Sequence, residues 1–247
     1  MLTVDAALDR LTHSLAAAKR LGADSADAIY VGDGSTGIGV RMGVLEDIGR
    51  SEGEEVGLRV FVGQRSASVS SSDLSVDALQ EAVERAVAMA REAPEDAYAG
   101  LAPAELLMHE TPRDLDIDDG GEISAEKLKD MALAAEDAAR AVAGVTNSEG
   151  GSASSGRAVM ALATSTGFAR GYHGTSYGVS ASVIAGEGTG MQRDYAYHSS
   201  RFATDLETPE SIGLRAGTRA VRRLGPIKLA TQSLPVVFDP RVGGGML

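Results

Sequence analysis

Apolar residues recur with a period of two in residues 54–73, the pattern of a β-hairpin that buries one face. The apolar positions of this stretch are Val56, Leu58, Val60, Val62, Ala67 and Val69. Gly63-Gln64 fits a two-residue type II′ turn because glycine readily takes a positive φ, and this turn would place Val60 opposite Ala67. The other face of the return segment carries Ser66, Ser68 and Ser70. The pattern predicts an antiparallel sheet with one apolar face that helices must cover.

Four other segments repeat apolar residues at i, i+3, i+4 and i+7, which is typical of amphipathic helices. Each begins after a Ser or Thr, whose side chain can accept hydrogen bonds from the first free N–H groups of a helix. The predicted N-caps are Thr3, Ser75, Ser124 and Thr208, and the apolar stripes end at Leu21, Ala90, Val142 and Leu224.

Shorter alternating segments predict further strands. In the first half, glycines interrupt three of them, Ala26–Val31, Ile38–Arg41 and Val44–Arg50, which lead into the hairpin. In the second half, a meander is predicted from Arg157–Thr164, Ser176–Ala185 and Met191–Ala203, and a last short strand from Leu234–Phe238.

The order of these elements predicts an α+β fold made of two successive units of antiparallel sheet covered by helices. The units span residues 1–95 and 123–232, and residues 96–122 form an acidic, proline-containing linker. Residues 233–247 read as the start of a truncated third segment. The glycines before Met246-Leu247 would anchor a packed terminus poorly, so we expect the chain to be the front part of a longer protein.

The composition excludes several classes of function. The chain has no cysteine, so disulfides and thiolate metal sites are excluded. No run approaches the roughly 18 apolar residues of a membrane span, and no basic, apolar signal segment opens the chain, so we expect a cytoplasmic protein without membrane contact. A net charge of −12 argues against direct nucleic-acid binding. The arginines of residues 215–223 favour a solvated helix face instead.

Two glycine-containing motifs lack the context that their chemistry requires. Gly32, Gly34 and Gly37 match a dinucleotide fingerprint, but the residues that follow predict a strand and not the helix that would meet a pyrophosphate. Gly174 to Gly178 spell G-x-S-x-G beside His173, yet an alternating strand follows where a nucleophile elbow needs a helix. An independent hydrolase that uses Ser176 is therefore the least favoured function.

The remaining matches have simpler explanations. Ser124 and Lys127 fit S-x-x-K, but Ser124 also stands where an N-cap is needed. His109-Glu110 begins like a zincin helix, but no second histidine follows and Pro112 would interrupt the helix. The acids Asp114, Asp116, Asp118 and Asp119 lack the glycine and the final glutamate of a calcium loop and favour a solvated linker. No catalytic or metal-binding residue is predicted in this chain.

Four stretches resemble the TldD/PmbA family, and more narrowly its PmbA (TldE) branch, described as a modulator of DNA gyrase. They are GLRVFVGQRSASVSSSD, ERAVAMAREAPEDAYAGL, GYHGTSYGVSASVIAGEGTGMQRDYAY and PVVFDPRVGGG, in this order over nearly the whole chain. The resemblance implies a cytoplasmic, heteromeric metalloprotease that cleaves unfolded or leader peptides. It places the zinc on an H-E-x-x-x-H helix of a TldD-like partner, and no such motif occurs here.

The resemblance thus implies a non-catalytic subunit that contributes to peptide binding and assembly, without a cofactor of its own. The expected partners are a TldD-like subunit and unfolded or leader peptides, with a homodimer as a further option. The alternative is a non-enzymatic binding module that acts on a client such as DNA gyrase. Tyr195, Tyr197 and His198 are the candidate peptide- or partner-facing residues, although these tyrosines could equally pack at a sheet edge.

Overall fold

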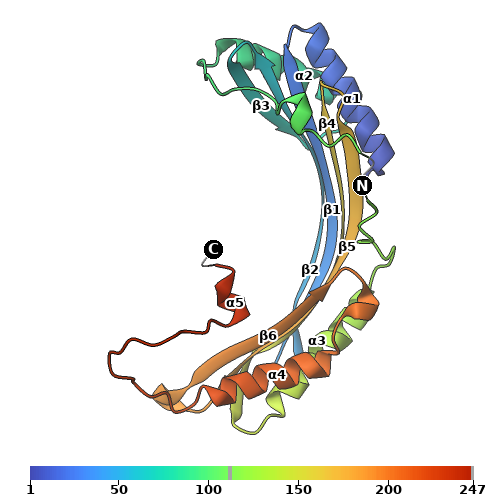
Figure 1. Cartoon of the computed structure of the whole chain (residues 1–247). Helices are drawn as coiled ribbons and strands as arrows, with labels where there is room; N and C mark the ends of the chain where they lie inside the picture. Colours follow the sequence, from blue (N-terminus) through green and yellow to red (C-terminus); the bar gives the residue numbers. More distant parts are fainter. Residues whose placement is uncertain (111–112, 246–247) are drawn as a thin grey trace.

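A single antiparallel sheet forms the centre of the computed structural model, which describes residues 1–110 and 113–245 (Figure 1). The order of the strands is β3-β2-β1-β4-β5-β6. They comprise β1 (Ser25–Arg41), β2 (Val44–Val62), β3 (Arg65–Ser71), β4 (Val145–Thr164), β5 (Ala169–Ala185) and β6 (Gln192–Ser200). The helices are α1 (Val4–Arg20), α2 (Val76–Glu92), α3 (Ala125–Arg140), α4 (Pro209–Arg222) and the short α5 (Pro240–Gly243). The predicted α+β class is confirmed.

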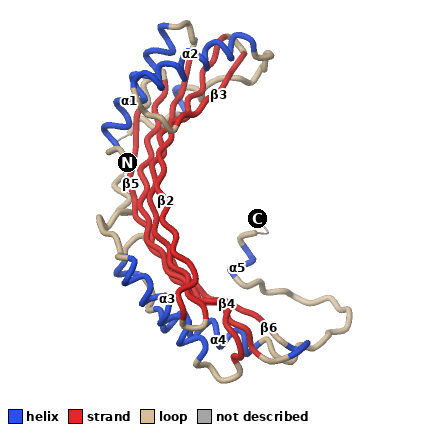
Figure 2. The backbone as a smooth tube through the Cα atoms, turned by 180° about the vertical axis from the view of Figure 1, so that it is seen from behind, coloured by secondary structure: helices blue, strands red, loops and turns tan. Residues whose placement is uncertain are grey.

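The sheet is strongly curved, and the four long helices all cover its convex side, with α1 and α2 at one end and α3 and α4 at the other (Figure 2). The side chains of β1 explain this arrangement. Ala26, Ala28 and Tyr30 are buried in the core under α1 and α2, while Ile38 and Val40 are buried with residues of α3. All five have even numbers, so α1 at one end and α3 at the other pack on the same face of β1. None of the four long helices lies on the concave face, and of the described helices only the short α5 is on that side (Figure 1).

The predicted hairpin and helix caps are confirmed. Val60 pairs with Ala67 and Leu58 with Val69, and Gly63 has a φ of 58° in the turn. The side chains of the four predicted N-caps each accept a hydrogen bond from the N–H three residues later; these caps are Thr3, Ser75, Ser124 and Thr208. Local sequence therefore determined the starts of the helices and the register of the hairpin.

The expected breaks at glycines in the first half are wrong. β1 continues through Gly32, Gly34, Gly37 and Gly39 without interruption, and β2 is equally long. A β-carbon at Gly32 would lie 2.3 Å from the hydroxyl oxygen of Tyr30, so this glycine makes room for a buried ring and does not end the strand. The strands β4 and β5 likewise extend beyond their predicted starts.

The short strand predicted at Leu234–Phe238 is also wrong, because these residues form no regular element and are exposed. A strand requires a neighbour to satisfy its backbone groups, and none lies beside this segment in the described chain. The helix α5 follows, capped by the Asp239 side chain, which accepts from the N–H of Arg241. The expectation for Met246-Leu247 falls outside the described residues.

The two predicted sets of strands meet in one sheet because β1 pairs with β4 from Asp27–Thr164 to Val40–Gly151. The tip of the β1–β2 hairpin is also tied to α3. The buried carboxylate of Glu136 accepts hydrogen bonds from the backbone N–H groups of Met42 (2.7 Å) and Gly43 (2.8 Å). Both turn residues have positive φ, which directs their N–H groups toward one acceptor.

Burial alone would raise the pKa of Glu136, but hydrogen bonds from Ser148 and from the N–H groups of Gly43 and Met42 lower it below its usual value. A lowered pKa in the folded state means that the ionised carboxylate stabilises the fold above its unfolded pKa. This contribution is lost as the pH falls through the folded pKa.

Glu136→Ala should lower the free energy of unfolding by roughly 2–4 kcal/mol, because the N–H groups of Met42 and Gly43 lose their charged acceptor. Asp130→Ala, an exposed position on the same helix, should change it by less than about 0.5 kcal/mol. Urea unfolding followed by circular dichroism measures both. The difference in the free energy of unfolding between wild type and Glu136→Gln should decrease as the pH falls from about 7 to about 3.5. Equal free energies of unfolding at about pH 7 would contradict this role of the charge.

No helix among the described residues is long and apolar enough to cross a membrane.

Candidate functional site

Tyr195 and Tyr197 lie on the concave face of β6, where their side chains are 43% and 54% exposed. Their rings stack with centroids 6.2 Å apart and an interplanar angle of 16°. On the neighbouring strand they stand opposite Ser182 and Ser180, small residues that leave the rings uncovered. The pair therefore forms a partly exposed aromatic surface at one end of the concave face.

His198 does not join the tyrosines. It follows Tyr197 directly in the strand, so its side chain points to the convex face, where it is half-buried. Its Nδ1 accepts a hydrogen bond from the N–H of Glu207, at 3.2 Å, next to the start of α4. The three residues predicted as one surface are thus divided between two faces, and the alternation of the strand already contained this signal.

At the free edge of β6, the backbone N–H and C=O groups of Tyr195 already have hydrogen-bond partners. The N–H of Tyr195 donates to the carboxylate of Asp194 (2.8 Å), and its carbonyl accepts from Arg219 and Arg241 (both 3.3 Å). The Arg241 guanidinium also lies 5.1 Å from the centre of the Tyr195 ring. A peptide could not add to the strand here without displacing these groups. The Tyr197 ring and the part of the Tyr195 ring that Arg241 leaves exposed remain available.

Asp194 positions the groups that cover this edge. It is buried and pairs with Arg241 (2.8 Å) and Arg223 (3.3 Å). Burial favours its neutral form, but hydrogen bonds from Arg241 and from the Tyr195 N–H outweigh burial and lower its pKa. The arginines predicted to form a solvated helix face are partly engaged, since Arg215 also pairs with Glu207 at 2.8 Å.

Small residues line the middle of the concave face. Cross-strand neighbours connect Gly37 with Ser154, Ser154 with Gly178, and Gly178 with Ser199. A hydrogen bond joins the hydroxyls of Ser152 and Ser180 at 2.8 Å. Side chains of a sheet approach one another on its concave side, so glycine and serine permit the curvature and leave a polar, shallow surface.

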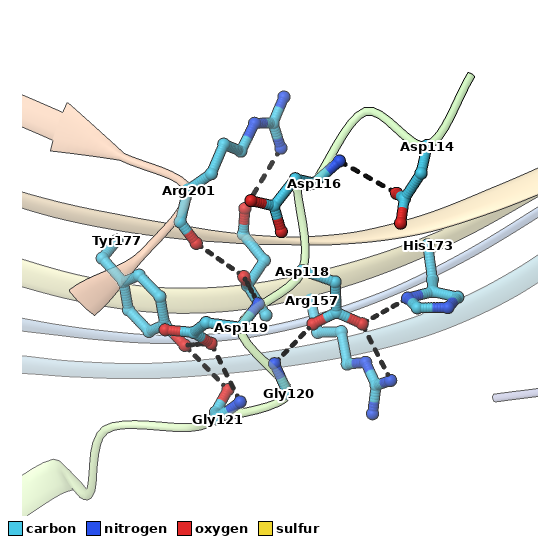
Figure 3. A network of polar contacts seen from close by, with 11 residues as sticks. Asp114, Asp116, Asp118, Asp119, Gly120, Gly121, Arg157, His173, Tyr177 and Arg201 are labelled. Atoms are coloured by element: carbon cyan, nitrogen blue, oxygen red, sulfur yellow. Dashed lines mark hydrogen bonds and ion pairs between the residues drawn. The ribbon is translucent and has the colours of Figure 1, made fainter. Parts of the chain in front are cut away.

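The acidic linker crosses the convex face between the two helix pairs (Figure 3). Asp118 bonds to His173 and pairs with Arg157 at 3.1 Å. Asp119 accepts hydrogen bonds from the Tyr177 hydroxyl and from the N–H of Ala203 (2.9 Å). The carbonyl of Ile117 accepts from the N–H of Thr175 on β5 at 2.9 Å.

These contacts correct the prediction of a solvated linker for Asp118 and Asp119, whereas Asp114 and Asp116 are exposed as expected. Burial raises the pKa of Asp118, but the Gly120 N–H, His173 and Arg157 lower it overall. The carboxylates are thus anchors that hold the linker on the sheet. Sequence reasoning missed them because their partners lie 39 to 84 positions away in the chain.

The other motif interpretations that the described residues test are confirmed. Ser176 lies inside β5 and points away from His173, so the G-x-S-x-G match has no nucleophile–base contact. Ser124 caps α3, and no helix follows the glycines of β1. Pro112, on which the argument against a zincin helix partly relied, lies outside the described residues.

The residues present do not fit the zinc that a metallopeptidase family implies. Within residues 1–110 and 113–245, no three His, Asp or Glu side chains gather to hold a metal ion. Two histidines have other roles, since His173 bonds to Asp118 and His198 accepts from Glu207. The described residues therefore do not form a zinc site.

Tyr177→Phe tests the linker anchor. The hydroxyl is buried and donates to Asp119, and burial followed by the nearby carboxylate raises the pKa of Tyr177 to about 12. Loss of this hydrogen bond should cost about 1–2 kcal/mol of unfolding free energy in denaturant titrations. Because the neutral form stabilises the fold, the contribution persists below about pH 10 and disappears as the pH rises toward about 12.

The same variant has a spectroscopic signature. Ultraviolet titration of tyrosinate should show a late step near about 12 in the wild type that is missing in Tyr177→Phe. Tyr172→Phe, which removes a half-exposed tyrosine from the same strand, should retain that step. Burial also raises the pKa of Tyr30, so a late step that survives Tyr177→Phe but disappears in Tyr30→Phe would contradict its assignment to Tyr177.

Comparison with known proteins places this geometry in a family. Residues 26–90 match the family model described as PmbA/TldA metallopeptidase domain 1, and residues 118–224 match the PmbA/TldA metallopeptidase central domain. The chain is 36% identical over 247 residues to Metalloprotease PmbA of Escherichia coli O157:H7, covering 98% of this chain and 55% of that protein. It is 33% identical to the Metalloprotease PmbA homolog of Haemophilus influenzae, covering 85% and 47%.

Solved structures agree on the fold. A putative modulator of DNA gyrase from Bacteroides thetaiotaomicron superposes with a TM-score of 0.83 at 22% identity, covering 93% of this chain and 52% of that one. TldE from Thermococcus kodakarensis gives 0.71 at 15% identity, covering 86% and 47%. The chain spans about half the length of the curated relatives it matches. The chain belongs to the PmbA/TldD metallopeptidase family, in its PmbA branch.

Proposed function

We propose that this chain is a non-catalytic, TldE-like part of a cytoplasmic metalloprotease that processes unfolded or leader peptides, with the zinc supplied by a TldD-like partner. The observation that carries the proposal is the concave face, which the four long helices leave uncovered, with the exposed Tyr195–Tyr197 pair. Its role is to bind an extended peptide and to assemble with the partner that cleaves it.

The concave face suits an extended peptide for physical reasons. Stacked tyrosines offer rigid apolar area at a low cost in side-chain entropy, and they can hold peptide side chains of many kinds. The serines and glycines beside them present hydroxyls and backbone to a passing chain without steric obstruction. Because the β6 edge is closed at Tyr195, the peptide would lie across the rings and would not extend the sheet there.

Removal of the aromatic pair tests the proposal. With a TldD-like partner and an unstructured peptide, cleavage should require both proteins. Tyr195→Ala with Tyr197→Ala should raise KM by roughly tenfold while kcat changes little, because the rings contribute binding and not chemistry. Tyr98→Ala, which removes a 95% exposed tyrosine from the linker, is the matched control and should leave KM unchanged.

Two outcomes would count against the proposal. Cleavage by the partner alone at the same rate would remove any need for this chain. An equal KM in the double variant and the Tyr98 control would show that the tyrosines do not contact the peptide.

The second candidate is a non-enzymatic binding module, favoured by the name of the Bacteroides relative as a putative modulator of DNA gyrase. Pull-down of gyrase by the purified protein, with no peptide cleavage under any zinc-loaded condition with the TldD-like partner, would support this candidate over the first.

A further inference from the structure

The lower half of β2 is an edge strand that nothing covers. Its last pairing with β3 joins Val56 to Ser71, so from Val44 to Glu55 only β1 flanks it. Residues 44–53 and Glu55 are exposed, whereas Val56 and Leu58, beyond the point where β3 begins, are buried.

The backbone groups of this edge point outward. Residues that flank a two-residue hairpin loop form a hydrogen-bonded pair, so Val62 and, by alternation, the other even-numbered residues of β2 direct N–H and C=O toward the β3 side. Below β3, this side of Ile48, Arg50 and Glu52 faces solvent. No hydrogen bond beyond the ladder with β1 involves their backbone among the described residues. They form a template for one more strand.

The charge of this edge determines which kind of segment can bind to it. Residues 46–55 carry five acids and one arginine. Arg50 is already neutralised by Glu52, whose carboxylate it contacts at 3.0 Å, and Glu54 binds the terminal ammonium at 2.7 Å. The remaining exposed acids are Glu46, Asp47 and Glu55. Asp47 and Glu55 lie on the concave face, and the paired Glu52 lies on the convex face.

A second copy of this chain fits the edge poorly. Antiparallel self-pairing centred on Ser51 would oppose Arg50 to Glu52, but it would also oppose Asp47 to Glu55, and like charges directly opposite destabilise a sheet. The edge of β6 differs, because the chain's own side chains close it. The β2 edge has open backbone groups and a net negative charge.

We propose that the edge of β2 at residues 46–55 is a docking strand for a basic, extended segment of a partner chain. The segment pairs antiparallel or parallel with β2 through the backbone groups of Ile48, Arg50 and Glu52. Its Lys or Arg side chains reach the acids on both faces, so its binding is sensitive to salt.

The test uses a labelled ten-residue peptide in which Lys-Lys pairs alternate with Thr-Thr pairs, so that an extended strand presents lysines on both faces; binding is followed by fluorescence anisotropy. A variant with Glu46→Gln, Asp47→Asn, Glu52→Gln and Glu55→Gln should bind it about tenfold more weakly. The matched control neutralises four exposed helical acids, Glu81→Gln, Glu84→Gln, Glu92→Gln and Glu126→Gln, and should bind as the wild type does. The net charge of both variants is the same, so long-range attraction alone would weaken them equally.

A second peptide separates strand pairing from charge attraction without altering the protein. N-methylation of the backbone amides keeps the charge of the peptide but removes the hydrogen-bond donors on both of its edges, and it should weaken binding at least about tenfold. Equal binding of both peptides, equal loss in both protein variants, or no binding of the basic peptide at low salt would each overturn the proposal. In those cases the acids only protect a free edge against aggregation.

Discussion

The pairing of β1 with β4 is the constraint on which the rest of the structure depends. Each residue of β1 from Asp27 to Val40 has a partner on both sides, in β2 and in β4. A shift of one residue in either register would invert every side chain of the shifted strand. Tyr30 and Ile38 would then face solvent and Asp33 would be buried, so both helix pairs would lose their core at once. One register thus fixes which face is apolar over the whole sheet.

Sequence patterns predicted the features that depend on residues close together in the chain. The caps at Thr3, Ser75, Ser124 and Thr208 and the register around Gly63 involve atoms a few residues apart, and all were confirmed. The glycines of β1 were misinterpreted because glycine is usually a breaker, whereas Gly32 makes room for the Tyr30 ring, and a single sequence does not reveal such a contact. The segment Leu234–Phe238 has strand composition but no neighbour, and composition alone cannot supply one.

The candidate site was predicted in part for the same reason. Alternation in β6 separates His198 from Tyr195 and Tyr197, and that period was readable in the sequence. The closure of the edge was not readable, because Arg219 comes from α4 and Arg241 from a segment 46 positions after Tyr195. Similarly, the acids of the linker looked solvated until the fold brought Asp118 to Arg157 and Asp119 to Tyr177. Contacts between distant segments decide which charged side chains are structural.

Curvature links the fold to its exposed surface. The helices and the Tyr30, Leu58 and Val60 side chains occupy the convex face, while glycines and serines line the middle of the concave face. The concave face is thereby freed from the core, and its residues can be serine, glycine or tyrosine without loss of buried area. The same reasoning applies to the strand edges. Below β3 the backbone of β2 contributes only to the ladder with β1, and its acids Asp47 and Glu55 are exposed. Residues outside the core in this way are the ones that partners and peptides can contact, and here they lie on the concave face and on the lower edge of β2.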